Sequence, residues 1–121
     1  LYVRCADRED EQYDDFVALE RQLQTLRTTD GRPYRLLPLP MPHAIREANE
    51  RLPATYANFL VVNGAVFCPT YGQEATDREA LRTIGQAYPG RQVVGIDARA
   101  VILQHGSLHC LTMQFPRGIL K

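Results

Sequence analysis

Residues 58–70 read Asn-Phe-Leu-Val-Val-Asn-Gly-Ala-Val-Phe-Cys-Pro-Thr, and they carry the strongest local fold signal in the chain. Two apolar runs, Asn58–Val62 and Val66–Thr70, flank the short segment 63–65. Asn-Gly between two such runs is typical of a β-hairpin turn. Because nearly every residue of both runs is apolar, we expect this hairpin to be buried on both faces.

The segments after the hairpin predict a helix and two further strands. Residues 76–79, Thr-Asp-Arg-Glu, form a capping box that should open a helix ending at Pro89-Gly90. We expect a strand at Gln92–Ile96, a short helical turn at 97–103, and a last strand over 105–116. The apolar face of the helix is formed by Ala80, Leu81, Ile84 and Tyr88.

The segments before the hairpin continue the alternation of strands and helices. Leu1–Cys5 reads as a strand, and an acidic stretch then leads into a helix of about 18 residues. A second strand is expected at Tyr34–Leu39, followed by a proline-rich loop that runs to Pro53. The apolar positions of this helix predict one buried stripe, Tyr13, Phe16, Leu19, Leu23 and Leu26. The order of elements indicates an α/β fold with mixed sheets.

Composition excludes several classes of function. With 121 residues the chain is at most one domain, and its 14 basic and 14 acidic side chains cancel. A neutral chain has no electrostatic footprint for nucleic acid or for an anionic membrane. No apolar run reaches the roughly 18 residues of a spanning helix, and we expect a cytoplasmic protein.

The three cysteines, Cys5, Cys68 and Cys110, are widely spaced and form no CxxC pair. We therefore expect free thiols, with neither a disulfide scaffold nor a zinc site. His105, His109 and Cys110 could be read as metal ligands, but Gly106 makes a continuous helix there improbable. No metal and no cofactor are predicted.

The run from His105 to Pro116 contains the candidate for chemistry. Cys110 follows a histidine and a glycine turn, inside an apolar and polar alternation. A cysteine fixed by a strand, with its sulfur facing a cleft, suits a positioned nucleophile. The other interpretation is a buried strand cysteine that acts as a small hydrophobe. On a strand, the side chain of His109 would point away from the Cys110 sulfur.

This run resembles the catalytic-cysteine segment of the agmatine deiminases and the Porphyromonas-type peptidylarginine deiminases. In that family the segment usually reads Gly-Gly-Gly-Asn-x-His-Cys-x-Thr-Gln-Gln-x-Pro. The departures here are Gln104 and His105 for two glycines, Ser107 for the asparagine and Met113 for a glutamine. Further segments also look like the family's, in the same order: 37–40, 51–59, 63–64, 69–72 and 94–97.

The resemblance covers residues 1 to about 116, roughly the last third of a family member. It implies one blade and neighbouring strands of a five-bladed, pentein-like α/β propeller. The chain also has no initiating Met and starts in an apparent strand at Leu1. We therefore expect residues 1–121 to be the C-terminal segment of a single catalytic domain. Its expected protein partner is either a missing N-terminal part of that domain or a second copy of the chain in a homo-oligomer.

The implied function is hydrolysis of agmatine to N-carbamoylputrescine and ammonia, in putrescine biosynthesis, through a covalent intermediate on Cys110. A peptidylarginine deiminase is the near alternative, and a truncated non-catalytic module that works by association is the second. The family's catalytic histidine stands in a Gly-His-x-Asp/Glu segment, which this chain lacks. By the family's order, that histidine and the guanidinium-binding carboxylates precede Leu1, so we expect the isolated chain to be inactive.

Three other residues are candidates for binding the guanidinium substrate, agmatine. Gly106 would let the loop approach a ligand closely, or would simply form a turn. Tyr56 and Asn58 follow Pro53, and alternation would place both on one face of a strand. Each would either hydrogen-bond across the site or brace the loop.

Overall fold

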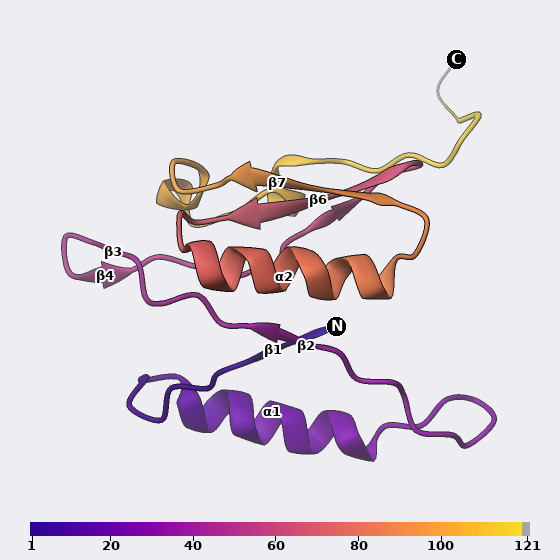
Figure 1. Cartoon of the computed structure of the whole chain (residues 1–121), viewed down its shortest axis with the longest axis horizontal. Helices are drawn as coiled ribbons and strands as arrows, with labels where there is room; N and C mark the ends of the chain where they lie inside the picture. The colour runs from indigo at the N-terminus through magenta and orange to yellow at the C-terminus, as the bar shows by residue number, and fades with distance from the viewer. Residues whose placement is uncertain (120–121) are drawn as a thin grey trace.

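The computed structural model describes residues 1–119 as a stack of helices and small sheets (Figure 1). Helix α1 lies against the pair β1–β2, and helix α2 lies between that pair and the sheet β5–β6–β7. The elements are β1 (Tyr2–Arg4), α1 (Tyr13–Thr25), β2 (Pro38–Pro40), β3 (Arg46–Glu47), β4 (Glu50–Arg51), β5 (Leu60–Val61), β6 (Ala65–Thr70), α2 (Glu74–Ala87), β7 (Gln92–Asp97) and the 3₁₀ helices η1 (Val101–Gln104) and η2 (His109–Leu111). The predicted α/β class with mixed sheets is confirmed.

The predicted hairpin forms the centre of the larger sheet. β5 pairs antiparallel with β6, and β7 pairs parallel with β6 along its whole length. The expected burial on both faces is met only in part: Val66 and Cys68 are fully buried on one face, whereas on the other Pro69 is fully buried and Phe67 is not. Pro69 has no backbone N–H to donate to a neighbouring strand. It is tolerated in this middle strand because β5 pairs only with Val66 and Phe67 and does not extend as far as Pro69.

Helix α2 is the most deeply packed element. Its buried residues Ala80, Thr83 and Ile84 face the core shared by the two sheets. The predicted start at Thr76 was wrong, because the helix begins at Glu74 and Thr76 lies inside its first turn. The side chain of Asp77 reaches back instead, accepting the backbone N–H of Gln73 at 2.9 Å. An acidic side chain therefore satisfies a donor at the helix start that the predicted cap would not have reached.

The N-terminal layer is thinner than the rest of the molecule. β1 and β2 are parallel, with Val3 opposite Leu39. No residue of α1 is buried, so the predicted buried stripe was wrong, and Leu19 keeps 39% of its surface exposed. A two-stranded sheet is too narrow to cover the whole apolar face of a helix. The contact is instead held by polar groups, since the Tyr2 hydroxyl donates to Glu20 at 2.8 Å.

The proline-rich loop contains a hairpin that the sequence did not predict. β3 and β4 pair antiparallel through Ala48 and Asn49, both of which have positive φ, at 45° and 69°. Successive residues with positive φ are typical of the tight turn that suits a two-residue hairpin. Arg51 at its end binds the carboxylate of Asp10 at 2.8 and 3.0 Å, which ties this hairpin to the segment after β1.

The predicted last strand over 105–116 was wrong. His105 has a left-handed backbone, with φ of 63°, and the chain then forms η2. The segment beyond η2 lies beside β5, where the Gln114 side chain donates to the carbonyl of Val61 at 2.6 Å.

Within the described residues, neither helix is long and apolar enough to cross a membrane.

Candidate functional site

Cys110 lies in an exposed 3₁₀ turn, which we call the cysteine loop (residues 105–112). The side chain of Asn58 donates to the Cys110 sulfur, with Nδ2 at 3.2 Å from Sγ. Hydrogen bonds with the Ser107 backbone and with Asn58 lower the pKa of the Cys110 thiol below its ordinary value. An exposed thiol whose thiolate is stabilised in this way has the character of a reactive cysteine.

Asn58 holds the cysteine loop at a second atom. Its Oδ1 accepts the backbone N–H of His109 at 2.8 Å, and its backbone carbonyl lies 3.3 Å from the same nitrogen. Of the residues predicted to bind substrate, Asn58 is therefore brought into direct contact with Cys110. The two residues are 52 positions apart, so no local pattern announces the contact.

Gly106 lies directly against the nucleophile candidate. A Cβ at this position would be 3.2 Å from Cys110 Cβ and 3.7 Å from its sulfur. That spacing is tighter than ordinary side-chain contact, so a larger residue would push on the cysteine. The predicted contact between Gly106 and a ligand stays a prediction, and the close approach seen here is to Cys110.

Tyr56 is fully buried and is not brought to Cys110. Its hydroxyl donates to Asp77 at 2.7 Å and lies 2.9 Å from the Thr76 hydroxyl, which anchors the loop before β5 to the start of α2. Its ring packs against Tyr71 with centroids 5.4 Å apart. This placement favours the bracing role over substrate contact.

A polar network that the sequence did not predict supports the cysteine loop from beneath. The Tyr71 hydroxyl donates to the carbonyl of Thr55 and accepts its N–H, each at 2.9 Å. It also lies 3.5 Å from the hydroxyl of Ser107, which is almost completely buried. The residue at the position of the family's usual asparagine therefore points into the molecule, next to the loop that carries Asn58.

The two neighbouring histidines do not activate the thiol in the described part of the chain. His109 was expected to face away from Cys110 on a strand, and that reasoning fails because successive residues of a 3₁₀ turn diverge by only about 120°. His105 points toward Glu50, with Nδ1 3.9 Å from the carboxylate. Within residues 1–119, the hydrogen bonds to the Cys110 thiol come from the Ser107 backbone, the Asn58 side chain and the Cys110 backbone, and none comes from a histidine.

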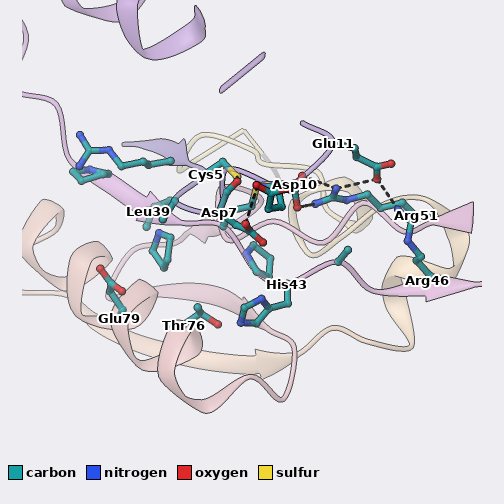
Figure 2. A pocket seen from close by; sticks show the side chains of 18 residues that line it. Cys5, Asp7, Asp10, Glu11, Leu39, His43, Arg46, Arg51, Thr76 and Glu79 are labelled. Atoms are coloured by element: carbon teal, nitrogen blue, oxygen red, sulfur yellow. Dashed lines mark hydrogen bonds and ion pairs between the residues drawn. The ribbon is translucent and has the colours of Figure 1, made fainter. Parts of the chain in front are cut away.

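A cavity of about 670 Å³ opens elsewhere, between the segment after β1 and the proline-rich loop (Figure 2). Arg51 lies at its edge and forms ion pairs with Asp10 and Glu11, and its hydrogen bonds lower the pKa of the Asp10 carboxyl. Cys5 lines this cavity, and burial raises the pKa of its thiol. The cavity is separate from Cys110, and Arg46 and Arg51 at its edge are both engaged in ion pairs with acidic side chains.

The described residues hold no group of three or more potential ligands placed to bind a metal ion.

The fold and the site together define a mixed α/β unit with an exposed, hydrogen-bonded cysteine on a loop beside its main sheet. The model of the family described as Porphyromonas-type peptidyl-arginine deiminase matches residues 1–116, and the chain belongs to this family. The resemblance found in the sequence is thereby confirmed.

Known proteins agree with this membership. A provisionally assigned agmatine deiminase from Marinomonas sp. (strain MWYL1) is 34% identical over 93% of this chain and 35% of its own length. The crystal structure of a provisionally assigned arginine deiminase from Porphyromonas gingivalis is 53% identical with a TM-score of 0.92, over 96% of this chain and 34% of that one. The agmatine deiminase of C. jejuni is 35% identical with a TM-score of 0.78, over 89% and 32% respectively. The chain thus spans about a third of the length of the relatives it matches.

Proposed function

We propose that Cys110 is the nucleophile of a guanidinium hydrolase, in which this chain provides one third of a five-bladed α/β propeller. The observation that carries the proposal is the exposed Cys110 sulfur, with Asn58 Nδ2 3.2 Å away and hydrogen bonds that favour its thiolate. The names of the relatives support agmatine as the substrate. Neither an acid–base histidine nor a carboxylate clamp meets the thiol within residues 1–119, so the proposal assigns both to the other two thirds of the domain.

In the proposed reaction, the Cys110 thiolate attacks the guanidinium carbon and forms a carbon–sulfur bond. The carbon–nitrogen bond to one terminal nitrogen then breaks, and ammonia leaves after taking a proton from the histidine. Water attacks the resulting thiouronium, gives up a proton to the same histidine and releases the thiolate. The sum is agmatine plus water giving N-carbamoylputrescine plus ammonia.

The test uses a protein of the relatives' length that contains residues 1–121, which we call the family-length protein. A haloacetamidine, which carries the amidinium of the substrate, should alkylate Cys110 selectively, and agmatine should block the reaction. Cys110→Ala should reduce ammonia release by at least about a thousandfold, as expected when a covalent nucleophile is removed. Cys68→Ala is the matched control and should keep turnover within about threefold, because Cys68 is buried away from solvent.

Ammonia release by Cys110→Ala within tenfold of the parent protein would overturn the assignment of the nucleophile. A protein that is folded and contains the family histidine, but neither releases ammonia nor reacts faster at Cys110 than at Cys5, would support the non-catalytic module instead. The 121-residue chain alone is expected to release no ammonia from agmatine, because binding and proton transfer depend on the remaining residues.

A peptidyl-arginine deiminase is the second candidate, because the matching family is described by that activity and the P. gingivalis structure is 53% identical. Both reactions use the same thiolate chemistry, so Cys110 does not distinguish them. Comparing kcat/KM for agmatine with that for a peptide containing an internal arginine does. A preference for the peptide would transfer the proposal to protein substrates and leave the role of Cys110 unchanged.

A further inference from the structure

Residues 43–51, which we call the lid segment, contain the hairpin β3–β4 and lie at one end of the molecule (Figure 1). The buried residues Pro42 and Leu52 flank the segment, and the Leu52 N–H donates to the carbonyl of Ile45 at 2.8 Å. Within the segment, only Ile45 packs against the apolar core. A segment that buries so little apolar surface opens easily unless polar contacts hold it in place.

The first such contact joins the lid segment to the segment after β1. The Arg51 guanidinium binds both carboxylate oxygens of Asp10, at 2.8 and 3.0 Å, and the two side chains are 14% and 13% exposed. Asp10 is also held by its own turn, because its Oδ1 accepts the backbone N–H of Gln12 at 2.9 Å. A bidentate ion pair that is largely shielded from water is stronger and more directional than one at the surface.

The second contact joins the lid segment to the start of α2. The Gln73 side chain accepts the backbone N–H of His43 at 2.7 Å and donates to the carbonyl of the same residue at 2.9 Å. One carboxamide therefore pairs with both backbone groups of His43, as a neighbouring β-strand would. The lid segment is thus attached to α2 at its first residue and to the N-terminal layer at its last residue.

The cavity of about 670 Å³ lies between these two attachments (Figure 2). Cys5 and Asp10 line it from the segment after β1, Thr76 lines it from α2, and His43 and Arg51 line it from the lid segment. Cys5 is only 6% exposed. Burial raises the pKa of its thiol, which the charge of Asp10 also raises and the charge of Arg51 lowers. The Cys5 thiol therefore lies close to the ion pair that holds the lid segment.

We propose that the lid segment closes this cavity, that the Asp10–Arg51 ion pair latches it shut, and that its opening controls access to the Cys5 thiol. The inference goes beyond the proposed function, because the reaction assigned to Cys110 uses neither the lid segment nor Cys5. Access to Cys5 depends on a contact between two side chains that are 41 positions apart. A second thiol is thereby protected in the closed state and reactive in the open state.

Arg51→Gln is the decisive variant, because it changes access to Cys5 and the charge around Cys5 in opposite directions. Loss of the Arg51 charge removes an effect that lowers the pKa of the Cys5 thiol, so the fraction of thiolate falls. Faster labelling can therefore come only from better access. The experiment measures iodoacetamide labelling of Cys5 at pH 8 in the native family-length protein, with peptide mass spectrometry as the readout. The rate should rise at least about tenfold, because the hydrogen bonds between charged groups that hold the lid segment are lost.

Arg46→Gln is the matched control on the same hairpin. Arg46 binds Glu11 at 2.8 Å, but the two side chains are 46% and 52% exposed, so labelling of Cys5 should stay within about threefold of the parent. Gln73→Ala releases the other attachment and should speed labelling of Cys5 by at least about threefold. Cys68 is fully buried and reports global unfolding, so its labelling should not change in any of these variants.

Four results would overturn the inference. They are labelling of Cys5 that is no faster in Arg51→Gln than in the parent, an equal rise in Arg46→Gln, a rise at Cys68 that matches the rise at Cys5, and an unchanged rate in Gln73→Ala. The third result would mean that the whole fold opens. The fourth would mean that the segment after β1 moves alone and that residues 43–51 are not the lid.

Arg51→Lys keeps the experiment decisive if circular dichroism shows that Arg51→Gln fails to fold. Lysine keeps the positive charge beside Cys5 but cannot bind both carboxylate oxygens of Asp10. Labelling of Cys5 should then rise by at least about threefold, and a rate equal to that of the parent would overturn the inference.

Discussion

Strand β6 and the cysteine loop each carry a cysteine, and the two thiols are in opposite environments. Cys68 has no exposed surface, and burial raises its pKa to about 12. Cys110 is exposed, and hydrogen bonds lower its pKa. The two thiols belong to the same fold, so the reactivity of each depends on the burial and the polar contacts around its own sulfur.

The two regions also differ in how they are held. β6 is fixed by sheet pairing on both edges and by apolar packing beneath α2. The cysteine loop has no sheet partner within the described residues and depends on contacts to Asn58 and on the Tyr71 network. Strand β6 is held by many packing contacts, whereas the cysteine loop is held by a few polar contacts. The loop is therefore sensitive to the loss of any one of those contacts.

The largest expected contrast is in thiol reactivity. At pH 7 in the native protein, Cys110 should react with iodoacetamide at least about a thousandfold faster than Cys68. The thiolate fraction alone gives this ratio, since a pKa of about 12 and one below 9.0 differ by more than three units. Labelling in 8 M urea is the control, and there the two cysteines should react within about threefold of one another. Similar native rates would show that the environments do not differ as described.

The pH dependence of stability follows from the same burial. Folding raises the pKa of Cys68 from 9.0 to about 12. The neutral thiol therefore contributes its full stability below pH 9, and that contribution is lost as the pH rises toward 12. Cys110 has the opposite sign, because its lowered pKa favours the folded state above pH 9 and the gain is lost as the pH falls. The claim for Cys68 is tested by comparing the urea unfolding midpoints of Cys68→Ala and its parent at pH 8 and at pH 10.5.

The second contrast is in packing. Ile84→Ala should lower the free energy of unfolding by about 2–5 kcal/mol, because Ile84 is fully buried between the sheets and truncation leaves a cavity. Leu111→Ala, in the cysteine loop, should change it by less than about 0.5 kcal/mol, since 57% of that side chain is exposed. Urea unfolding of the family-length protein measures both changes in the free energy of unfolding. An equal loss in Leu111→Ala and Ile84→Ala would mean that Leu111 is buried rather than exposed.

The core could largely be predicted from local patterns. The Asn63-Gly64 turn between apolar runs located the hairpin, and helical periodicity located the buried face of α2, although the capping box misplaced the start of that helix. These signals are local because turn chemistry and amphipathic spacing act over a few residues. The capping box failed because Asp77, one position after Thr76, reaches the backbone of Gln73 across the first turn.

The candidate site could be predicted only in part. Cys110 stood out by its motif, but alternation suggested a strand where the structure has a 3₁₀ turn. Alternating apolar residues form a strand only when a partner strand is available, and here Asn58 binds the backbone of His109 instead. That contact spans 51 positions. Long-range polar contacts leave no periodic trace in a sequence, so the role of Asn58 required the structure.

The third contrast concerns how the core supports the site. Tyr56→Phe removes the hydroxyl that donates to Asp77 at 2.7 Å and should lower the free energy of unfolding by about 1.5–3 kcal/mol. Tyr34→Phe is the control, because Tyr34 is exposed, and it should be neutral. If Tyr56→Phe left stability unchanged but weakened agmatine binding, the tyrosine would act on the substrate and the bracing role would be wrong.

The smallest contrast compares two glycines. Gly106→Ala places a methyl group 3.2 Å from Cys110 Cβ, so the cysteine must shift by a few tenths of an ångström. Gly64→Ala, in the hairpin turn, meets nothing within 4 Å. Neither glycine has a φ that alanine finds strained, so the backbone term is the same small gain from the unfolded chain in both.

We therefore expect both glycine variants to stay within about 1 kcal/mol of the parent in unfolding free energy. Only Gly106→Ala should slow alkylation of Cys110, by about threefold or more, because a displaced sulfur no longer meets the Asn58 donor at 3.2 Å. The labelling rate of Cys110 in the two variants, measured at one pH near neutrality, decides the matter. Equal rates would mean that the cysteine loop absorbs the added methyl group without moving the sulfur, and that the nucleophile is held less tightly than its contacts indicate.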